Sequence, residues 1–128
     1  MGMIDRLHRP LHHRAVHAFR RAAENGDTEQ LAALLDPRVA VVVDAGDRDQ
    51  HMVRVVRGAY EAMALLIHGM AAKPGLVIDE RPVNAQAGLM LRRGDETIAA
   101  MTVDFTRGLV SMVWIRLRPE TVRHWNHV

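Results

Sequence analysis

The stretch Leu109–Leu117, which reads LVSMVWIRL, decides how this chain folds. Apolar residues occupy both of its alternating sets, with Met112 and Trp114 in one and Val113, Ile115 and Leu117 in the other. Because successive side chains of a strand point to opposite faces of the sheet, this pattern predicts a strand that is buried on both faces. We expect one face to meet helices of the same chain. We expect the other to meet a second subunit, which predicts a homodimer through the sheet.

The segments upstream of this strand supply the rest of a sheet. Residues 76–83, 88–92 and 97–105 have strand patterns, and the short turns between them favour an antiparallel meander that ends in the stretch above. Further upstream, residues 39–43 form an uninterrupted and mostly β-branched run, which is typical of a buried strand. The turn residues after this run predict a hairpin with residues 52–56.

Apolar residues at helical spacing predict three helices. The first begins at Leu11 and stops at Asn25-Gly26, because glycine accepts the left-handed backbone that closes a helix. The second begins after Asp27 as its cap and ends before Pro37, because the residue preceding a proline is pushed out of the helical region. The third follows Gly58 and continues for about three turns.

This order of elements predicts one α+β domain. Three amphipathic helices are available to cover the apolar face of a curved antiparallel sheet, which is a hairpin plus a four-stranded meander. We expect the helices to wrap the sheet into a cone with an apolar pocket between the layers. The domain is expected to span residues 11–122, after a disordered or extended segment at 1–10 and before a C-terminal tail at 123–128.

Composition limits the classes of function. The 128 residues are 48% hydrophobic, which suffices for one domain with one core. Because 17 basic residues face 15 acidic ones, the net charge is only +2, and we expect neither nucleic acid nor membrane as a partner. The absence of cysteine excludes disulfides, thiolate metal sites and cysteine nucleophiles. No long apolar run or signal-like start is present, so we expect a soluble cytoplasmic protein.

The order of elements and several segments resemble the nuclear-transport-factor-2-like superfamily, and more closely its SnoaL-like branch. Residues 19–27, 31–37 and 39–44 look like the opening helix pair and first strand of the family. Residues 83–89 and 113–120 look like the accessory C-terminal domain of certain extracytoplasmic-function sigma factors. In that domain, which is thought to modulate the sigma factor, an Asp-Gly-Gly-Gly-Lys motif follows the first strand and Asn-Pro-Asp-Lys-Leu ends the chain.

Both motifs are altered in this chain. Residues 44–48 read Asp-Ala-Gly-Asp-Arg, and residues 118–122 read Arg-Pro-Glu-Thr-Val. Too few residues precede the first predicted helix to build the promoter-binding domains of a sigma factor, at about 1.5 Å of rise per helical residue. We therefore expect that the chain is not itself a sigma factor.

Asp44 is the candidate catalytic residue if the chain is an enzyme. Several enzymes of the superfamily use a pocket carboxylate as general acid or base, and Asp44 ends the first strand near where isomerase-like members place theirs. Two alignments of this segment differ by one residue, and such a slip turns the side chain to the opposite face. The alternative is a solvated acid that caps the turn at Ala45 or Gly46, because Asp is a preferred turn residue.

The other polar residues give weaker indications of a catalytic or metal-binding site. Asp104 has the parity opposite to its large apolar neighbours, so we expect it to face away from a pocket. His13 and His17 stand four apart, as two metal ligands on a helix can, but no third ligand is evident, and we predict neither a metal nor another cofactor. No nucleophile elbow or glycine-rich phosphate loop is present.

The predicted pocket is lined by apolar and aromatic side chains, several of them adaptable methionines. They are Phe19, Val41, Tyr60, Met63, Ile67, Met112 and Trp114. Our first hypothesis is a non-catalytic domain that binds a small apolar molecule or has a regulatory role. The alternative is a SnoaL-like cyclase, isomerase or hydratase that acts on an apolar carbonyl compound with Asp44. A third hypothesis is a protein-interaction module that uses Trp114, Arg118 and the tail to His127.

Overall fold

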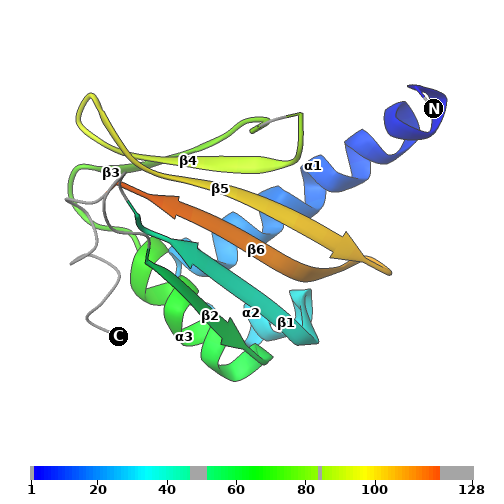
Figure 1. Cartoon of the computed structure of the whole chain (residues 1–128). Coiled ribbons are helices and arrows are strands. Elements are labelled where there is room, and N and C mark those ends of the chain that lie inside the picture. Colours follow the sequence, from blue (N-terminus) through cyan, green and yellow to red (C-terminus); the bar gives the residue numbers. More distant parts are fainter. Residues whose placement is uncertain (1, 47–51, 84, 119–128) are drawn as a thin grey trace.

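The structure is a computed structural model that describes residues 2–46, 52–83 and 85–118, with side chains from His13 onward. Its elements follow one another as shown in Figure 1. They are α1 (Gly2–Glu24), α2 (Thr28–Leu34), β1 (Leu35–Asp44), β2 (Val53–Arg57), α3 (Ala59–Met70), β3 (Leu76–Glu80), β4 (Gly88–Arg93), β5 (Glu96–Thr106) and β6 (Leu109–Leu117). Within these ranges no helix has both the length and the apolar composition needed to cross a membrane.

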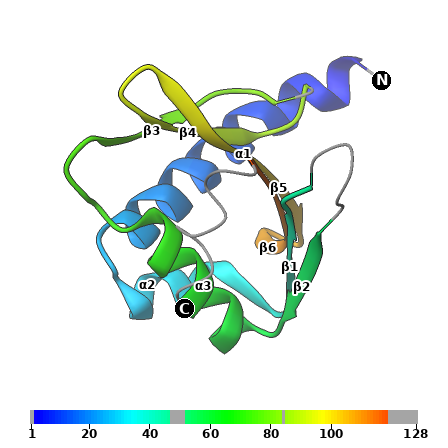
Figure 2. The same cartoon turned by 60° about the vertical axis from the view of Figure 1, so that its left-hand side comes forward.

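The strands form one six-stranded sheet in the order β2-β1-β6-β5-β4-β3. The hairpin of β1 and β2 joins the meander through β1 and β6, which pair in parallel, whereas the other neighbours are antiparallel. The expected α+β class, with three helices on a curved sheet, is confirmed (Figure 2). The expected cone is not closed, because β2 and β3 lie at opposite edges of the sheet and do not pair with each other.

The helices cover one side of the sheet, which Figure 1 shows from the opposite side. Large side chains with less than 2% exposure fill the space between the two layers. From the helices these are Phe19, Leu31, Leu65, Leu66 and Met70, and from the strands they include Val41, Leu89, Leu91, Met101 and Ile115. Burying each of them stabilises the fold by about 1.5–3 kcal/mol before the cost of ordering is counted.

Three boundaries differ by three or more residues from those expected. β1 begins at Leu35 rather than at Val39, because α2 already ends at Leu34, before the stop that was expected at Pro37. Residues 2–10 are helical rather than disordered or extended, because α1 begins at Gly2 and not at Leu11. In the sequence, Ile4 and Leu7 continue the helical spacing of apolar residues that is evident after Leu11. β3 ends at Glu80, three residues earlier than predicted. Pro82 follows, and it has no N–H group to donate to a strand ladder. The predicted tail at 123–128 lies outside the described residues.

Gly88, the first residue of β4, is at a point where three segments approach one another. An added Cβ would lie 2.6 Å from the carbonyl oxygen of Met101 on β5. It would also lie 2.7 Å from Cγ2 of Val83, which precedes β4. Real Cβ contacts are essentially never below 3.0 Å. A side chain at position 88 would therefore force β4 away from β5.

Gly88→Ala should destabilise the domain by about 2–3 kcal/mol, the cost of overpacking against backbone. Gly94→Ala is the control, because its added Cβ would meet no described atom within 4 Å and only its positive φ of +61° is strained. That strain costs about 1 kcal/mol. Urea unfolding of both variants measures the difference, and equal losses would mean that crowding at position 88 is not the cause.

Candidate functional site

The structure does not bring the seven predicted pocket residues together. Phe19 and Val41 are fully buried in the core, and Met63 and Ile67 are partly buried against it. Tyr60, at the start of α3, is 81% exposed. Met112 and Trp114 are on β6, but their side chains point away from the helices.

Strand register explains why Trp114 and Val41 are separated. Val41 pairs with Val113, and Val42 pairs with Trp114. Since neighbouring positions on a strand alternate between faces, Val41 and Val113 face the helices, whereas Val42 and Trp114 face the other way. Val113 is fully buried in the core cluster, and Trp114 is 45% exposed. The apolar pocket itself stays a prediction.

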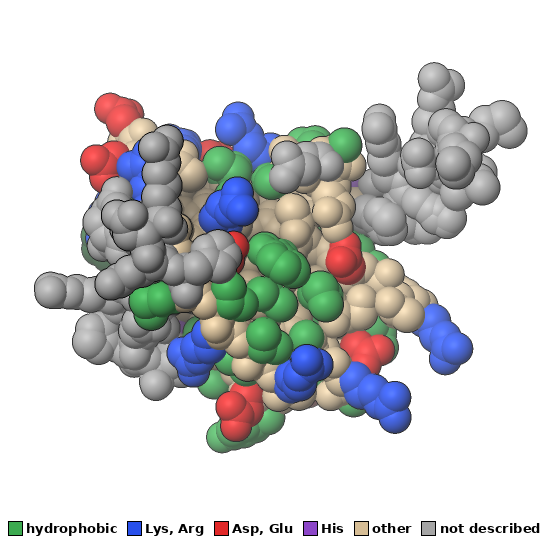
Figure 3. Space-filling model, in the orientation of Figure 1, with side chains coloured by type: hydrophobic (Ala, Val, Ile, Leu, Met, Phe, Trp, Pro, Cys, Tyr) green, Lys and Arg blue, Asp and Glu red, His purple; other side chains and the backbone are tan. Residues whose placement is uncertain are grey.

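We call the side of β2, β1, β6 and β5 that points away from the helices the outer face. It consists of the residues that alternate with the core residues on these strands, which are Ala40, Val42, Asp44, Val53, Val55, Arg57, Ala100, Thr102, Asp104, Met112, Trp114 and Arg116. Figure 3 views this side and shows hydrophobic side chains gathered over its centre, with basic and acidic side chains around them.

The centre of the outer face is a row of side chains that runs across the strands. Val55, Val42, Trp114 and Thr102 are register neighbours on β2, β1, β6 and β5. Val42 is only 7% exposed although it does not belong to the core cluster behind the sheet. Its neighbours Val55 and Trp114 remain about half exposed. The row is therefore mostly apolar, with Val55 and Trp114 exposed on either side of Val42, and we call it the apolar ridge.

Asp44 lies on the outer face, at the end of β1. It is buried, and its side chain is 10% exposed. It is therefore not solvated, unlike the turn-capping acid that the sequence offers as the alternative. Oδ2 of Asp44 lies 4.0 Å from Nη2 of Arg116, its register neighbour on β6. Because Val43 and Ala45 on either side belong to the core cluster, the carboxylate points away from the helices. This position separates Asp44 from the interior where a pocket was expected.

Asp104 also lies on the outer face, in register with Met112. It is exposed, and Nε2 of Gln86 donates a hydrogen bond to its Oδ1. Asp44 and Asp104 are thus on the same side of the sheet but on different strands. The outer face carries acidic groups at two of its margins.

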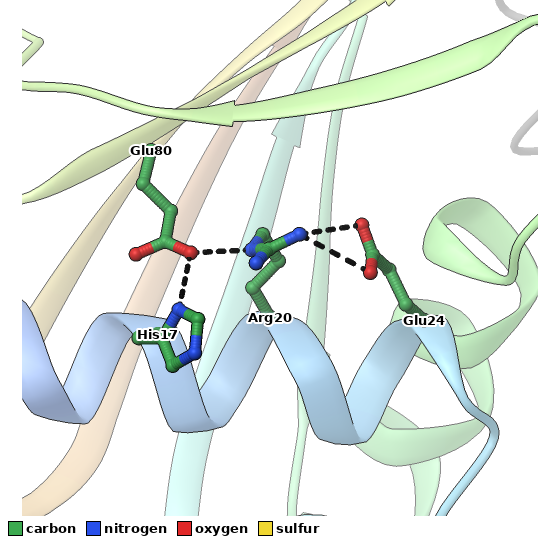
Figure 4. A network of polar contacts seen from close by, with 4 residues as sticks. All are labelled: His17, Arg20, Glu24 and Glu80. Carbon is green, nitrogen blue, oxygen red and sulfur yellow. Dashed lines mark hydrogen bonds and ion pairs between the residues drawn. The ribbon is translucent and has the colours of Figure 1, made fainter.

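A polar cluster that sequence reasoning missed joins α1 to β3 (Figure 4). Oε2 of Glu80 accepts a 2.5 Å hydrogen bond from Nε of Arg20 and lies 2.7 Å from Nδ1 of His17. Nη1 of Arg20 donates to both oxygens of Glu24, at 3.1 and 3.2 Å. One guanidinium therefore bridges two carboxylates, and it ties the edge strand β3 to the helix.

The surroundings of Glu80 act on its pKa in opposite directions. Partial burial raises the pKa of Glu80. Hydrogen bonds from His17 and Arg20 and the charge of Arg20 lower it by more, so that the net pKa is below the ordinary value of 4.5. The pKa of Arg20 is raised, because its pairing with Glu80 and Glu24 outweighs the effect of burial, which lowers it. Arg20 and Glu80 are therefore both charged at neutral pH.

One sequence signal points to this cluster. Glu80 shares its parity on β3 with Ile78, which belongs to the core cluster, so its carboxylate faces α1. His17, Arg20 and Glu24 are spaced so that they line one side of α1. The pairing between them could not be predicted, since Glu80 is 60 residues away from Arg20.

Glu80→Gln should destabilise the domain at pH 7 by about 1–2 kcal/mol, because Arg20 and His17 lose a charged acceptor. A carboxylate with a lowered folded-state pKa stabilises fully above its ordinary value, here 4.5, and loses this effect as the pH falls through the folded-state value. The difference between wild type and variant should therefore shrink below pH 4.5. Urea unfolding across pH measures it, with the exposed Glu96→Gln as control. A difference that does not change with pH would contradict this assignment.

No protein-family model matches the sequence. No curated protein matches it either. Solved structures do match its fold. An NTF-2 like protein of unknown function from Burkholderia xenovorans aligns with a TM-score of 0.61 at 12% identity, over 88% of this chain and 86% of that one.

Two further structures have assigned activities. The extracytoplasmic function sigma factor SigJ of Mycobacterium tuberculosis aligns with a TM-score of 0.62 at 20% identity, over 90% of this chain but only 45% of the sigma factor. An LEH-like epoxide hydrolase from M. tuberculosis aligns with a TM-score of 0.53 at 15% identity, over 91% of this chain and 90% of that one. The same fold thus occurs in a sigma factor and in an epoxide hydrolase, so the likeness does not choose between their functions. The chain has the nuclear-transport-factor-2-like fold.

Proposed function

We propose that this chain is a non-catalytic regulatory domain that works as a homodimer, with the outer face as the dimer surface. The observation that carries the proposal is the apolar ridge, where Trp114 and Val55 are about half exposed beside the buried Val42. A contiguous exposed apolar patch with a charged margin is typical of a protein interface. Tryptophan at the centre of such a patch is often where most of the binding energy lies.

The placement of the acids supports a non-catalytic role. A general acid or base must reach the substrate together with the other groups that orient it. Asp44 is on the outer face beside Arg116, on the opposite side of the sheet from the apolar interior. Glu24 and Glu80 are both engaged by Arg20. Among the described residues, these acids do not converge on the core, and the enzyme hypothesis with Asp44 is not favoured.

The interior supports the same choice. Between helices and sheet, the described side chains include large apolar groups with almost no exposure, such as Phe19, Leu66 and Met101. Such packing favours a core that stabilises the domain. Binding of a small apolar molecule in the interior stays a prediction of the sequence. The third hypothesis, an interaction module, shares Trp114 with our proposal, but its tail to His127 lies outside the described residues.

Wild type should be a dimer in light scattering at micromolar concentration, and Trp114→Ser should weaken it by roughly 30-fold or more, the effect of losing an interface hot spot of about 2 kcal/mol. Tyr60→Ser is the matched control, because Tyr60 is also an exposed aromatic residue but belongs to α3. It should leave the dissociation constant unchanged. A wild-type protein that stays monomeric would overturn the proposed dimer.

A further inference from the structure

The outer face carries opposite charges at positions that match when the face meets a copy of itself. We infer that two copies pack about a twofold axis that runs along the strands, between β1 and β6, and that Arg57 of each copy pairs with the partner's Asp104. This inference rests on the proposed homodimer and adds its register. The occupant is a second copy of this chain because the charge pattern complements itself.

Strand register sorts the outer face into three rows across β2, β1, β6 and β5. The apolar ridge is the middle row. On one side of it lies the row Arg57, Ala40, Met112 and Asp104. On the other side lies the row Val53, Asp44, Arg116 and Ala100. Each flanking row thus holds one arginine and one aspartate, at equal distances from the line between β1 and β6.

The twist of sheets limits how two of them pack face to face. Sheets that pack in the aligned mode keep their strand directions within about 30° of each other. A homodimer with a shared surface is related by a twofold axis. If the homodimer uses this aligned mode, the axis runs nearly along the strands or nearly across them, and these two arrangements bring different residues together.

An axis along the strands, between β1 and β6, exchanges the two halves of every row. Arg57 then lies opposite the partner's Asp104, and Arg116 lies opposite the partner's Asp44. In the middle row, Val42 lies opposite the partner's Trp114. All charged positions of the two flanking rows meet opposite charges, and the apolar ridge meets itself.

An axis across the strands, through the ridge, exchanges the two flanking rows instead. Arg57 would lie opposite the partner's Val53, and Arg116 would lie opposite the partner's Met112. Each charge would then lose water without gaining a partner, which is costly. Moving the lengthwise axis onto β6 or β1 would place Arg116 or Asp44 opposite its own copy, which brings like charges together. The axis between β1 and β6 avoids both penalties.

The outer pair, Arg57 and Asp104, is accessible in one copy, where Oδ1 of Asp104 accepts a hydrogen bond from Gln86, whereas Asp44 of the inner pair is buried. Arg57 and Asp104 are exposed, and among the described residues the structure records no ion pair for Arg57. They cannot pair within one copy, since three strand spacings of about 4.8 Å separate β2 from β5. Arg116 is 76% exposed, and its Nη2 lies 4.0 Å from Oδ2 of Asp44 in the same copy.

Charge reversal directly tests the inferred pairing of Arg57 with the partner's Asp104. Arg57→Asp would place an acid opposite the partner's Asp104, and Asp104→Arg would place a base opposite the partner's Arg57. Each variant alone should dissociate at least tenfold more readily than wild type in light scattering across a dilution series. Mixing the two variants should restore dimers to within about threefold of wild type, because both contacts of the mixed dimer then join opposite charges.

Controls separate the register from the fold and from the dimer itself. Arg93→Asp changes an exposed arginine that is not on the outer face and should leave the dissociation constant unchanged. Thermal melts of each variant check that it folds. If wild type is a dimer but mixing does not restore association, the register is wrong and the dimer proposal stands. If wild type is a monomer, both proposals fail.

Discussion

The parallel pairing of β1 with β6 is the constraint on which the rest of the structure depends. It joins the hairpin to the meander and makes one sheet of six strands. It aligns Val41 with Val113 on the side of the helices and Val42 with Trp114 on the other side. A slip of one residue would exchange these sets, exposing core valines and pushing Asp44 into the apolar interior. The register of β1 against β6 therefore determines both which side chains form the hydrophobic core and which form the outer face.

Local patterns in the sequence are enough to predict most of the helices and strands. β6 matches its predicted bounds because apolar residues in both alternating sets are hard to place anywhere but in a central strand. Asp27 is the cap of α2, as predicted, and its side chain accepts a hydrogen bond from the backbone N–H of Gln30. These features depend on residues a few positions apart. Sequence reasoning handles such short-range relations well.

The candidate site was harder to predict, because it depends on which strands become neighbours. The sequence pattern places Trp114 and Val41 in one pocket, since both are apolar and both lie on predicted strands. Only the register of β1 against β6 shows that they face opposite sides. Glu80 was missed for a similar reason, because its partners on α1 are far away in the sequence. The parity of Trp114 within β6 nevertheless indicates a second apolar face, which the structure leaves about half exposed at Trp114.

The same parallel pairing sets the order in which the chain can fold during its synthesis. Ala40 pairs with Met112, so β1 cannot complete its contacts until β6 has left the ribosome. Until then, the hairpin and helices of the first half lack the strand that closes their core, and the valines of β1 are without their neighbour. Contacts between distant segments form slowly, and open strand edges invite wrong pairing. The nascent chain is thus prone to aggregation until β6 emerges and pairs with β1.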